Sequence, residues 1–347
     1  SASDSTSGIG GFESSLDNTT WIPYTTPLTF TDGAYTVYLR ATDNAGHETL
    51  FTQEIKVDSQ EPMVSHQIQG TAGENGWYTS DIRVEVTQVD PAPASGIQFF
   101  QTSLDGTNWT DYSTPLDFSE GTYLLQMRVM DNADHQDLDG IPLNVDTTPP
   151  TIDGTLAGQL ARGTIYISPV RAEVAVTDST SGIASTEYSL DGSGWLPYLS
   201  PLTINDGDHQ LQFKTKDSAG LVSMTQVYEF SVDTHGPNIK LPSRWYIWET
   251  GDLFVKDDGS GIASISYEIR DRKGRWKKVE QNWTLNQEIF THEIAWNRRF
   301  ADGTLAPDGE YPLRVSAIDQ AGHSSQKTAR IIIPPANATP LPTFTPT

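Results

Sequence analysis

The stretch that decides the fold is Ser181-Gly-Ile-Ala-Ser-Thr-Glu-Tyr-Ser-Leu-Asp-Gly-Ser-Gly-Trp195, because its landmarks recur along the chain. The glycine of the Ser-Gly-Ile signature stands at positions 8, 96, 182 and 261, so successive copies begin 88, 86 and 79 residues apart. Self-similarity with a period of this size indicates tandem copies of one small domain. The sequence therefore predicts three full copies and one partial copy.

The composition is strongly acidic, with 45 Asp and Glu against 22 Lys and Arg in 347 residues and a net charge of -23. Such a surface repels phosphate backbones and anionic lipids, which argues against nucleic-acid partners. No apolar run reaches the ~18–20 residues that span a bilayer, so no membrane insertion is expected within this stretch. The absence of cysteine excludes disulfides, thiolate nucleophiles and cysteine-based zinc sites.

The third copy shows the strand pattern most clearly. Apolar residues alternate with polar ones, and turns rich in Asp, Ser and Gly separate the alternating segments, as at Asp191-Gly192. We expect strands at residues 170–176, 186–190, 209–216 and 226–232. About seven short strands per copy without helical periodicity predict an all-β chain of tandem Ig-like β-sandwich domains arranged end to end.

A tyrosine follows an acidic residue and a glycine in three copies, at Tyr35, Tyr123 and Tyr311, and an apolar residue stands two positions later. This is the arrangement of the tyrosine corner of Ig-like sandwiches. The third copy carries His209 at that position, so its corner is expected to be altered.

The predicted boundaries are 1–58 for a partial Ig-like repeat, 59–146 and 147–233 for two full repeats, 234–335 for a divergent Ig-like domain, and 336–347 for a Pro/Thr-rich linker or tail. The junctions between repeats are short and contain proline, which restricts bending. The partial repeat lacks the first strands of its neighbours, which would leave open sheet edges. Either the chain is a fragment of a longer protein, or another chain supplies the missing strands by β-augmentation.

Tryptophans recur at Trp21, Trp109 and Trp195, and we expect them to pack in the core or on the hairpins. The divergent domain holds five of the nine tryptophans: Trp245, Trp248, Trp276, Trp283 and Trp296. Such a cluster could form a sugar-stacking platform or a docking face. The alternative is that these rings pack a longer sandwich of different shape.

Aspartates recur where one repeat passes into the next. In an Ig-like array the end of the last strand meets two loops of the next domain, and convergent carboxylates suit calcium. Alternatively each aspartate satisfies only its own turn. The predicted groups are Asp58 with Asp90 and Asp131, Asp146 with Asp178 and Asp217, and Asp233 with Asp257, Asp258 and Asp319.

The order of landmarks, from Ser-Gly-Ile through Tyr-Ser-Leu-Asp-Gly to Val-Asp-Thr-Thr-Pro-Pro, resembles bacterial Ig-like repeats of the OmpL47 type over residues 1–236. The last domain resembles them only at 258–262 and 311–322, and its middle is more similar to the Ig-like domains of flagellar hook-capping proteins. The resemblance implies a stalk, spacer or adhesive arm of a bacterial surface or secreted protein.

No nucleophile–base pair, phosphate loop or metal-hydrolase motif is present, so no catalytic residue is predicted. We predict a non-enzymatic, extracellular or cell-surface rod, with calcium at its junctions as the one expected cofactor. Its partners would be other protein chains or cell-surface components. The alternatives are a filament subunit assembled by strand donation to the first repeat, and a glycan- or protein-binding accessory region of a larger secreted protein.

Overall fold

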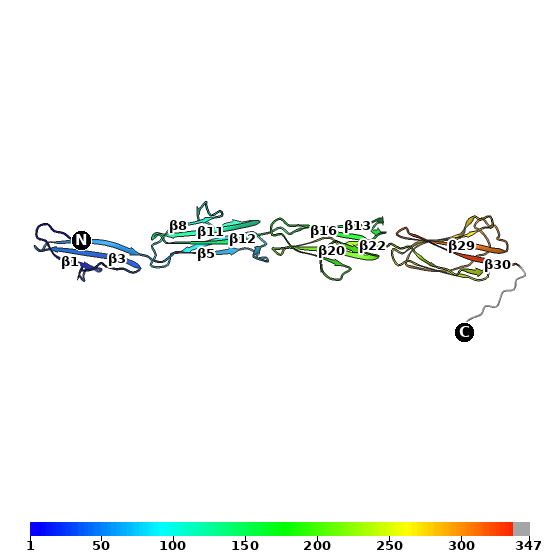
Figure 1. The fold of residues 1–347 in the computed structure, drawn as a ribbon, viewed down its shortest axis with the longest axis horizontal. Coiled ribbons are helices and arrows are strands. Elements are labelled where there is room, and N and C mark those ends of the chain that lie inside the picture. Colours follow the sequence, from blue (N-terminus) through cyan, green and yellow to red (C-terminus); the bar gives the residue numbers. More distant parts are fainter. Residues whose placement is uncertain (336–347) are drawn as a thin grey trace, which may run out of the picture. The chain divides into compact units, whose positions relative to one another are not determined.

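The computed structural model describes residues 1–335, apart from the side chains of residues 280 and 281. These residues form strands and turns without an α-helix, and Figure 1 colours the strands in sequence order. Among them there is no helix of the length and apolarity needed to cross a bilayer. The tail predicted at 336–347 lies outside the described residues.

The chain divides into two compact units. The first holds residues 1–149 together with two loops of the third repeat, 178–182 and 217–221. The second holds the rest of the third repeat and the fourth repeat.

The second repeat is a two-layered sandwich. Its smaller sheet has the order β10 (Leu116–Phe118), β7 (Ile82–Val89) and β5 (Met63–Gln69), and its larger sheet has the order β6 (Trp77–Tyr78), β12 (Gln136–Val145), β11 (Gly121–Asp131), β8 (Ile97–Ser103) and β9 (Thr110–Asp111). The short strand β6 runs parallel to β12, and the other pairs are antiparallel. Alternate residues of β7 and β11 meet in one core, with Val84, Leu125 and Met127 fully buried.

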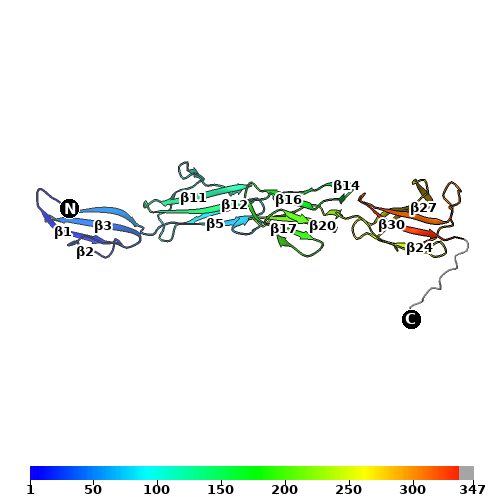
Figure 2. The same cartoon turned by 45° about the vertical axis from the view of Figure 1, so that its right-hand side comes forward.

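The third repeat repeats this plan. Its smaller sheet has the order β13 (Thr151–Ala157), β16 (Val170–Thr177) and β19 (Leu202–Ile204). Its larger sheet has the order β14 (Leu160–Arg162), β15 (Ile165–Tyr166), β22 (Tyr228–Val232), β20 (Gly207–Asp217), β17 (Ile183–Leu190) and β18 (Leu196–Pro197), with β21 (Val222–Met224) also paired to β20. Several of these strands are labelled in Figure 2, where they are coloured green.

The fourth repeat has the same two layers and the largest core. One sheet has the order β23 (Asn238–Lys240), β25 (Gly251–Lys256) and β28 (Ile289–Ile294), and the other has the order β24 (Arg244–Tyr246), β30 (Ser324–Ile333), β29 (Gly309–Asp319), β26 (Ile262–Arg270) and β27 (Trp276–Gln287). Three repeats with this pairing confirm the predicted all-β fold of Ig-like sandwiches in tandem.

The first repeat is a single sheet with the order β2 (Ile22–Pro23), β1 (Ile9–Ser15), β3 (Gly33–Asp43) and β4 (Glu48–Val57). Among the described residues, no three-stranded sheet belongs to this repeat. Leu39 of β3 therefore stays half-buried, whereas Met127, at the same position of β11, is fully buried. Phe51 on β4 is exposed over 56% of its surface.

The tyrosine corners of the second and fourth repeats are formed as expected, whereas the Tyr35 hydroxyl meets the side chain of Thr31, and the histidine of the third repeat preserves the bond. The hydroxyl of Tyr123 lies 3.2 Å from the carbonyl oxygen of Ser119, and that of Tyr311 lies 2.6 Å from the carbonyl of Pro307. His209 Nε2 lies 2.8 Å from the carbonyl of the corresponding residue, Asn205. The predicted alteration is therefore a change of side chain that keeps the contact.

Candidate metal centres at the repeat junctions

The serine of the Ser-Gly-Ile signature binds the aspartate that ends the preceding repeat. In each full repeat its backbone N–H donates to that carboxylate, across Ser95–Asp58 (2.7 Å), Ser181–Asp146 (3.2 Å) and Ser260–Asp233 (2.8 Å). In the first repeat the N–H of Ser7 donates instead to Asp4 of its own loop, at 2.6 Å. The recurring signature is thus a contact between consecutive repeats.

The glycine of the signature binds a second aspartate, four to six residues before it in its own loop. The contacts are Gly96–Asp90 (2.7 Å), Gly182–Asp178 (2.6 Å) and Gly261–Asp257 (2.7 Å). These glycines have φ values of 90°, 77° and 83°, which glycine adopts without strain. The fourth repeat uses Asp257 here, whereas the predicted Asp258 is exposed and pairs with Lys256. Of the two predicted aspartates, Asp257 therefore makes the contact to the signature glycine.

A third aspartate is the last residue of the long strand and the first residue of the Asp-x-Ala turn. One oxygen of Asp131, Asp217 and Asp319 accepts the N–H of the residue four positions later, at 2.8 to 2.9 Å. The other oxygen meets a histidine in two repeats, at 3.0 Å between Asp131 and His135 and at 3.2 Å between Asp319 and His323. The third repeat has Leu221 at that position, and the second oxygen of Asp217 is buried without a hydrogen-bond partner.

One predicted group is brought together in full, and two aspartates of each of the other groups lie close to each other. One potential ligand atom from each member lies within 4.8 Å of the others in three sets: Asp58–Asp131–His135, Asp146–Asp178–Asp217 and Asp233–Asp319–His323. Each set lies within one compact unit. Asp90 falls outside the set of the first junction, and Asp257 and Asp258 fall outside that of the last. The histidines were not among the predicted ligands.

Burial sets the electrostatics of these groups. Loss of solvent raises the pKa of Asp217 above its usual value, and the neighbouring charges of Asp146 and Asp178 raise it further. Burial likewise raises the pKa of Asp257 and of Asp319, with a further contribution from Asp233. Negative charges held together out of water favour a cation among them. Calcium at these places stays a prediction.

A second contact at the same junctions was not predicted. The carboxylate of Glu120 accepts hydrogen bonds from the hydroxyls of Thr147 and Thr148, each at 2.8 Å, and from that of Thr180 at 2.6 Å. Asp32 and Asp206 make corresponding contacts to the residues after their own last strands. The signal is present in the sequence, because an acidic residue precedes the corner glycine in every copy, but the pattern alone does not indicate which groups its carboxylate contacts.

The Glu120 contact predicts a pH dependence of stability. The threonine hydrogen bonds lower the pKa of Glu120 from 4.5 to about 2. A lowered folded-state pKa means that the stabilisation is complete above about pH 4.5 and is lost as the pH falls toward about 2. Glu120→Gln should therefore cost about 1 kcal/mol at neutral pH, allowing for screening at a half-exposed site. At pH 2 the variant and the parent should unfold together.

Thermal unfolding of both proteins from pH 2 to pH 7 measures this difference. Glu85→Gln is the matched control, because Glu85 is exposed on β7 and has no described partner. A gap between the Glu120 variant and the parent that stays constant with pH would contradict the assignment.

The five tryptophans of the fourth repeat do not gather into one face. Trp245 and Trp296 are buried in the core, only 5% and 4% exposed, so their rings are not available for stacking on a ligand. Trp283 packs partly against the same core. Trp248 is exposed and stacks on Tyr246, with ring centroids 4.9 Å apart.

Trp276 takes the place that tryptophan has in the other repeats. The guanidinium of Arg314 lies 4.5 Å from its ring centroid. The same contact holds a cation of the long strand over each recurring tryptophan: Arg40 over Trp21, Arg128 over Trp109 and Lys214 over Trp195. These rings pack against the sheet through cation–π contacts, in line with the hairpin packing expected from sequence.

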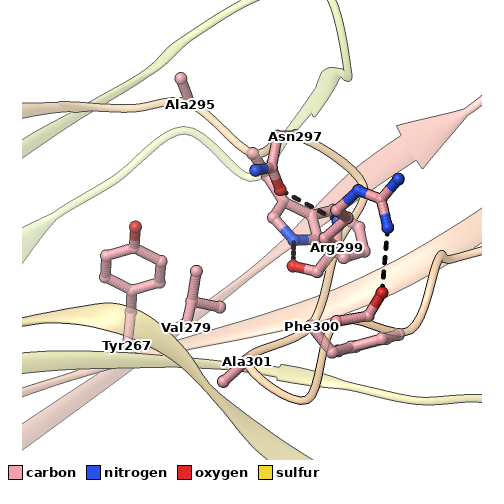
Figure 3. A pocket seen from close by; sticks show the side chains of 9 residues that line it. Tyr267, Val279, Ala295, Asn297, Arg299, Phe300 and Ala301 are labelled. Carbon is pink, nitrogen blue, oxygen red and sulfur yellow. Dashed lines mark hydrogen bonds between the residues drawn. The ribbon is translucent and has the colours of Figure 1, made fainter.

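The fourth repeat also contains a pocket of about 480 Å³ (Figure 3). Trp296 and Phe300 lie at its wall, and the indole N–H donates to the carbonyl of Arg299 at 2.7 Å. The backbone N–H of Arg299 donates to Asn297, and its guanidinium donates to the carbonyl of Gly303. Ligand binding by the fourth repeat stays a prediction, and this pocket and the exposed ring of Trp248 are the places for it.

Comparison with known proteins supports the domain type for part of the chain. Residues 248–333 match the family described as bacterial Ig-like domain. The match falls on the divergent fourth repeat, and the OmpL47-type relationship of the earlier repeats stays a prediction. Among curated proteins there is no significant match.

Several solved structures are similar to the chain. A tetra-tandem repeat from the extending region of a large adhesion protein is 12% identical, with 92% of this chain and 90% of that one covered and a TM-score of 0.40. A structure from a 1.5-MDa bacterial ice-binding adhesin is 13% identical, with 80% and 99% covered and a TM-score of 0.28. Fibronectin(III)-like modules of CbhA from Clostridium thermocellum are 16% identical, with 49% and 93% covered and a TM-score of 0.25. Similarities this low do not define a function.

Proposed function

We propose that the chain is a non-enzymatic spacer, the stalk or adhesive arm of a bacterial surface or secreted protein. The observation that carries this proposal is the repeated contact between the signature serine and the last aspartate of the preceding repeat, made at 2.7 to 3.2 Å. A serial contact of this kind limits bending wherever it recurs, as a spacer requires.

The chemistry of the junctions supports the same proposal. Hydrogen bonds to a carboxylate are worth roughly 1.5–3 kcal/mol each when they are shielded from water. Asp146 and Asp233 are 0% and 1% exposed, so water competes little for their contacts. The threonine contacts of Glu120 add a second restraint to the junction beside Asp146. Proline in each junction restricts the backbone further.

Small-angle X-ray scattering in EDTA tests the spacer. The parent protein should scatter as an elongated particle with a narrow cross-section. Glu120→Ala removes the acceptor shared by three threonines and should broaden the distribution of long distances, whereas Glu85→Ala should leave it unchanged. A compact particle, or equal curves for the parent and the Glu120 variant, would contradict the proposal.

A second candidate function rests on the first repeat, whose single sheet has no facing layer of its own among the described residues. Phe51, which pairs with Leu39 and lies on the same face of the sheet, is exposed and available to another chain. A strand donated by a second copy or a partner would cover this sheet and build a filament. The same scattering series decides the matter, because donation predicts a molar mass that grows with concentration and a spacer predicts a constant one.

A further inference from the structure

We propose that the set Asp146–Asp178–Asp217 binds one calcium ion, and that a histidine takes the place of the ion at the other two junctions. The proposal narrows the three sites expected from sequence to one. It does not depend on the spacer function.

The first observation is an unsatisfied oxygen. Asp217 is fully buried, and its Oδ2 atom has no hydrogen-bond partner. An unpaired buried carboxylate oxygen is costly, so a group that satisfies it is expected. Asp217 is also the residue that offers one oxygen within 4.8 Å of oxygens from Asp146 and Asp178. The unpaired group therefore belongs to a set of potential ligands.

The second observation is the comparison among repeats of the same chain. At the corresponding positions, Asp131 meets His135 and Asp319 meets His323 through the histidine Nδ1 atom. Because a carboxylate oxygen only accepts, Nδ1 carries the hydrogen in these contacts, and the second oxygens of Asp131 and Asp319 are satisfied without a metal ion. At the first junction the Oδ1 atom of Asp90 is also buried without a hydrogen-bond partner, but Asp90 lies outside the set of ligand atoms within 4.8 Å of one another. Leu221 offers no such donor, so the Asp217 oxygen stays open.

The ligand type favours calcium over other divalent ions. All three groups are carboxylates, and hard oxygen ligands select calcium or magnesium over zinc. Calcium accepts irregular shells of oxygen ligands, whereas magnesium demands near-ideal octahedral geometry and usually keeps several waters. One oxygen from each of the three carboxylates lies within 4.8 Å of the others, which is close enough for a single calcium ion to contact all three. Water would complete the coordination shell.

The test uses the full chain, stripped with EDTA and then titrated with calcium in equilibrium dialysis. We expect about one ion per chain, with Kd of about 10⁻⁴–10⁻³ M. Hydrogen exchange should slow in residues 178–182 and 217–221 and stay unchanged in residues 90–96. Magnesium at equal concentration should not displace the ion.

Two variants of the site separate binding from folding. Asp217→Asn keeps the shape and removes the charge, and Leu221→His gives this junction the side chain of the other two. Both should abolish binding at 178–182 and 217–221, while the unfolding temperature in EDTA does not fall below that of the parent, because each change relieves the unpaired carboxylate.

The reciprocal variant His135→Leu should open the first junction and raise the stoichiometry to about two ions. No binding by the parent would overturn the proposal, as would full binding by the Leu221 variant or an unchanged stoichiometry in the His135 variant. Because the scattering test is done in EDTA, none of these results would bear on the spacer.

Discussion

Gly259→Ala is expected to destabilise the fourth repeat by about 2–4 kcal/mol. A Cβ atom at position 259 would lie 2.3 Å from the carboxyl carbon of Asp233 and 2.4 Å from one of its oxygens. That carboxylate is 1% exposed and accepts the N–H groups of Ser260 and His235. The methyl group must displace it, so the variant combines overpacking with the loss of charge-assisted hydrogen bonds.

Urea unfolding followed by hydrogen exchange of the β29 amides measures this loss. Gly11→Ala is the matched control, because an added Cβ there has no heavy atom within 4 Å and the backbone needs no left-handed φ. The control should change stability by about 1 kcal/mol or less. Equal effects of the two substitutions would show that Asp233 is not held by the close approach of Gly259.

Met127→Ala should cost the second repeat about 2–5 kcal/mol, the usual range for truncating a fully buried side chain. Leu39→Ala, at the same position of the first repeat, should cost only about 1 kcal/mol. The difference follows from the second sheet, which buries Met127 and has no counterpart over Leu39 among the described residues.

Native-state hydrogen exchange of β11 and β3 reports each repeat separately, so overlapping unfolding transitions do not confuse the comparison. A cost at Leu39 as large as that at Met127 would mean that the first repeat has a complete core in solution. Covering of its sheet by another chain would be the first explanation to examine.

Much of the fold could be predicted because its cause is local. Period-two alternation predicted strands at 170–176 and 209–216, and the structure places β16 at Val170–Thr177 and β20 at Gly207–Asp217. The prediction missed β21, which pairs with the end of β20. Its three residues are too few to show alternation, and only the partner strand defines them.

For the candidate metal site, the order of the repeats along the chain predicted which aspartates come close together, but not their detailed contacts. The pairing of Asp146 with Asp178 and Asp217 followed from the general connectivity of Ig-like domains. The sequence could not show which of Asp257 and Asp258 faces the junction. The two residues are adjacent, and the turn that ends at Gly261 decides which carboxylate accepts the glycine N–H. The unpaired oxygen of Asp217 could not be predicted from the sequence. It follows from the burial of Asp217 in the fold and from the presence of Leu221 where two other repeats have histidine.

The tryptophans show the same limit. Five aromatic rings in one repeat are compatible with a surface platform or with a core, and sequence spacing does not separate the two. Burial of Trp245 and Trp296 depends on long-range packing of strands and loops that lie far apart along the chain.

The contact between the signature serine and the preceding aspartate gives the array a polarity. From the second repeat onward, the signature serine of each repeat donates its N–H to an aspartate of the repeat before it. In the first repeat, Ser7 donates its N–H to Asp4 of the same repeat. Stability in such a chain is a sum of unit terms and nearest-neighbour terms. Deleting a repeat should therefore weaken the one that follows it more than the one before it, so that an unfolding event spreads toward the C-terminus.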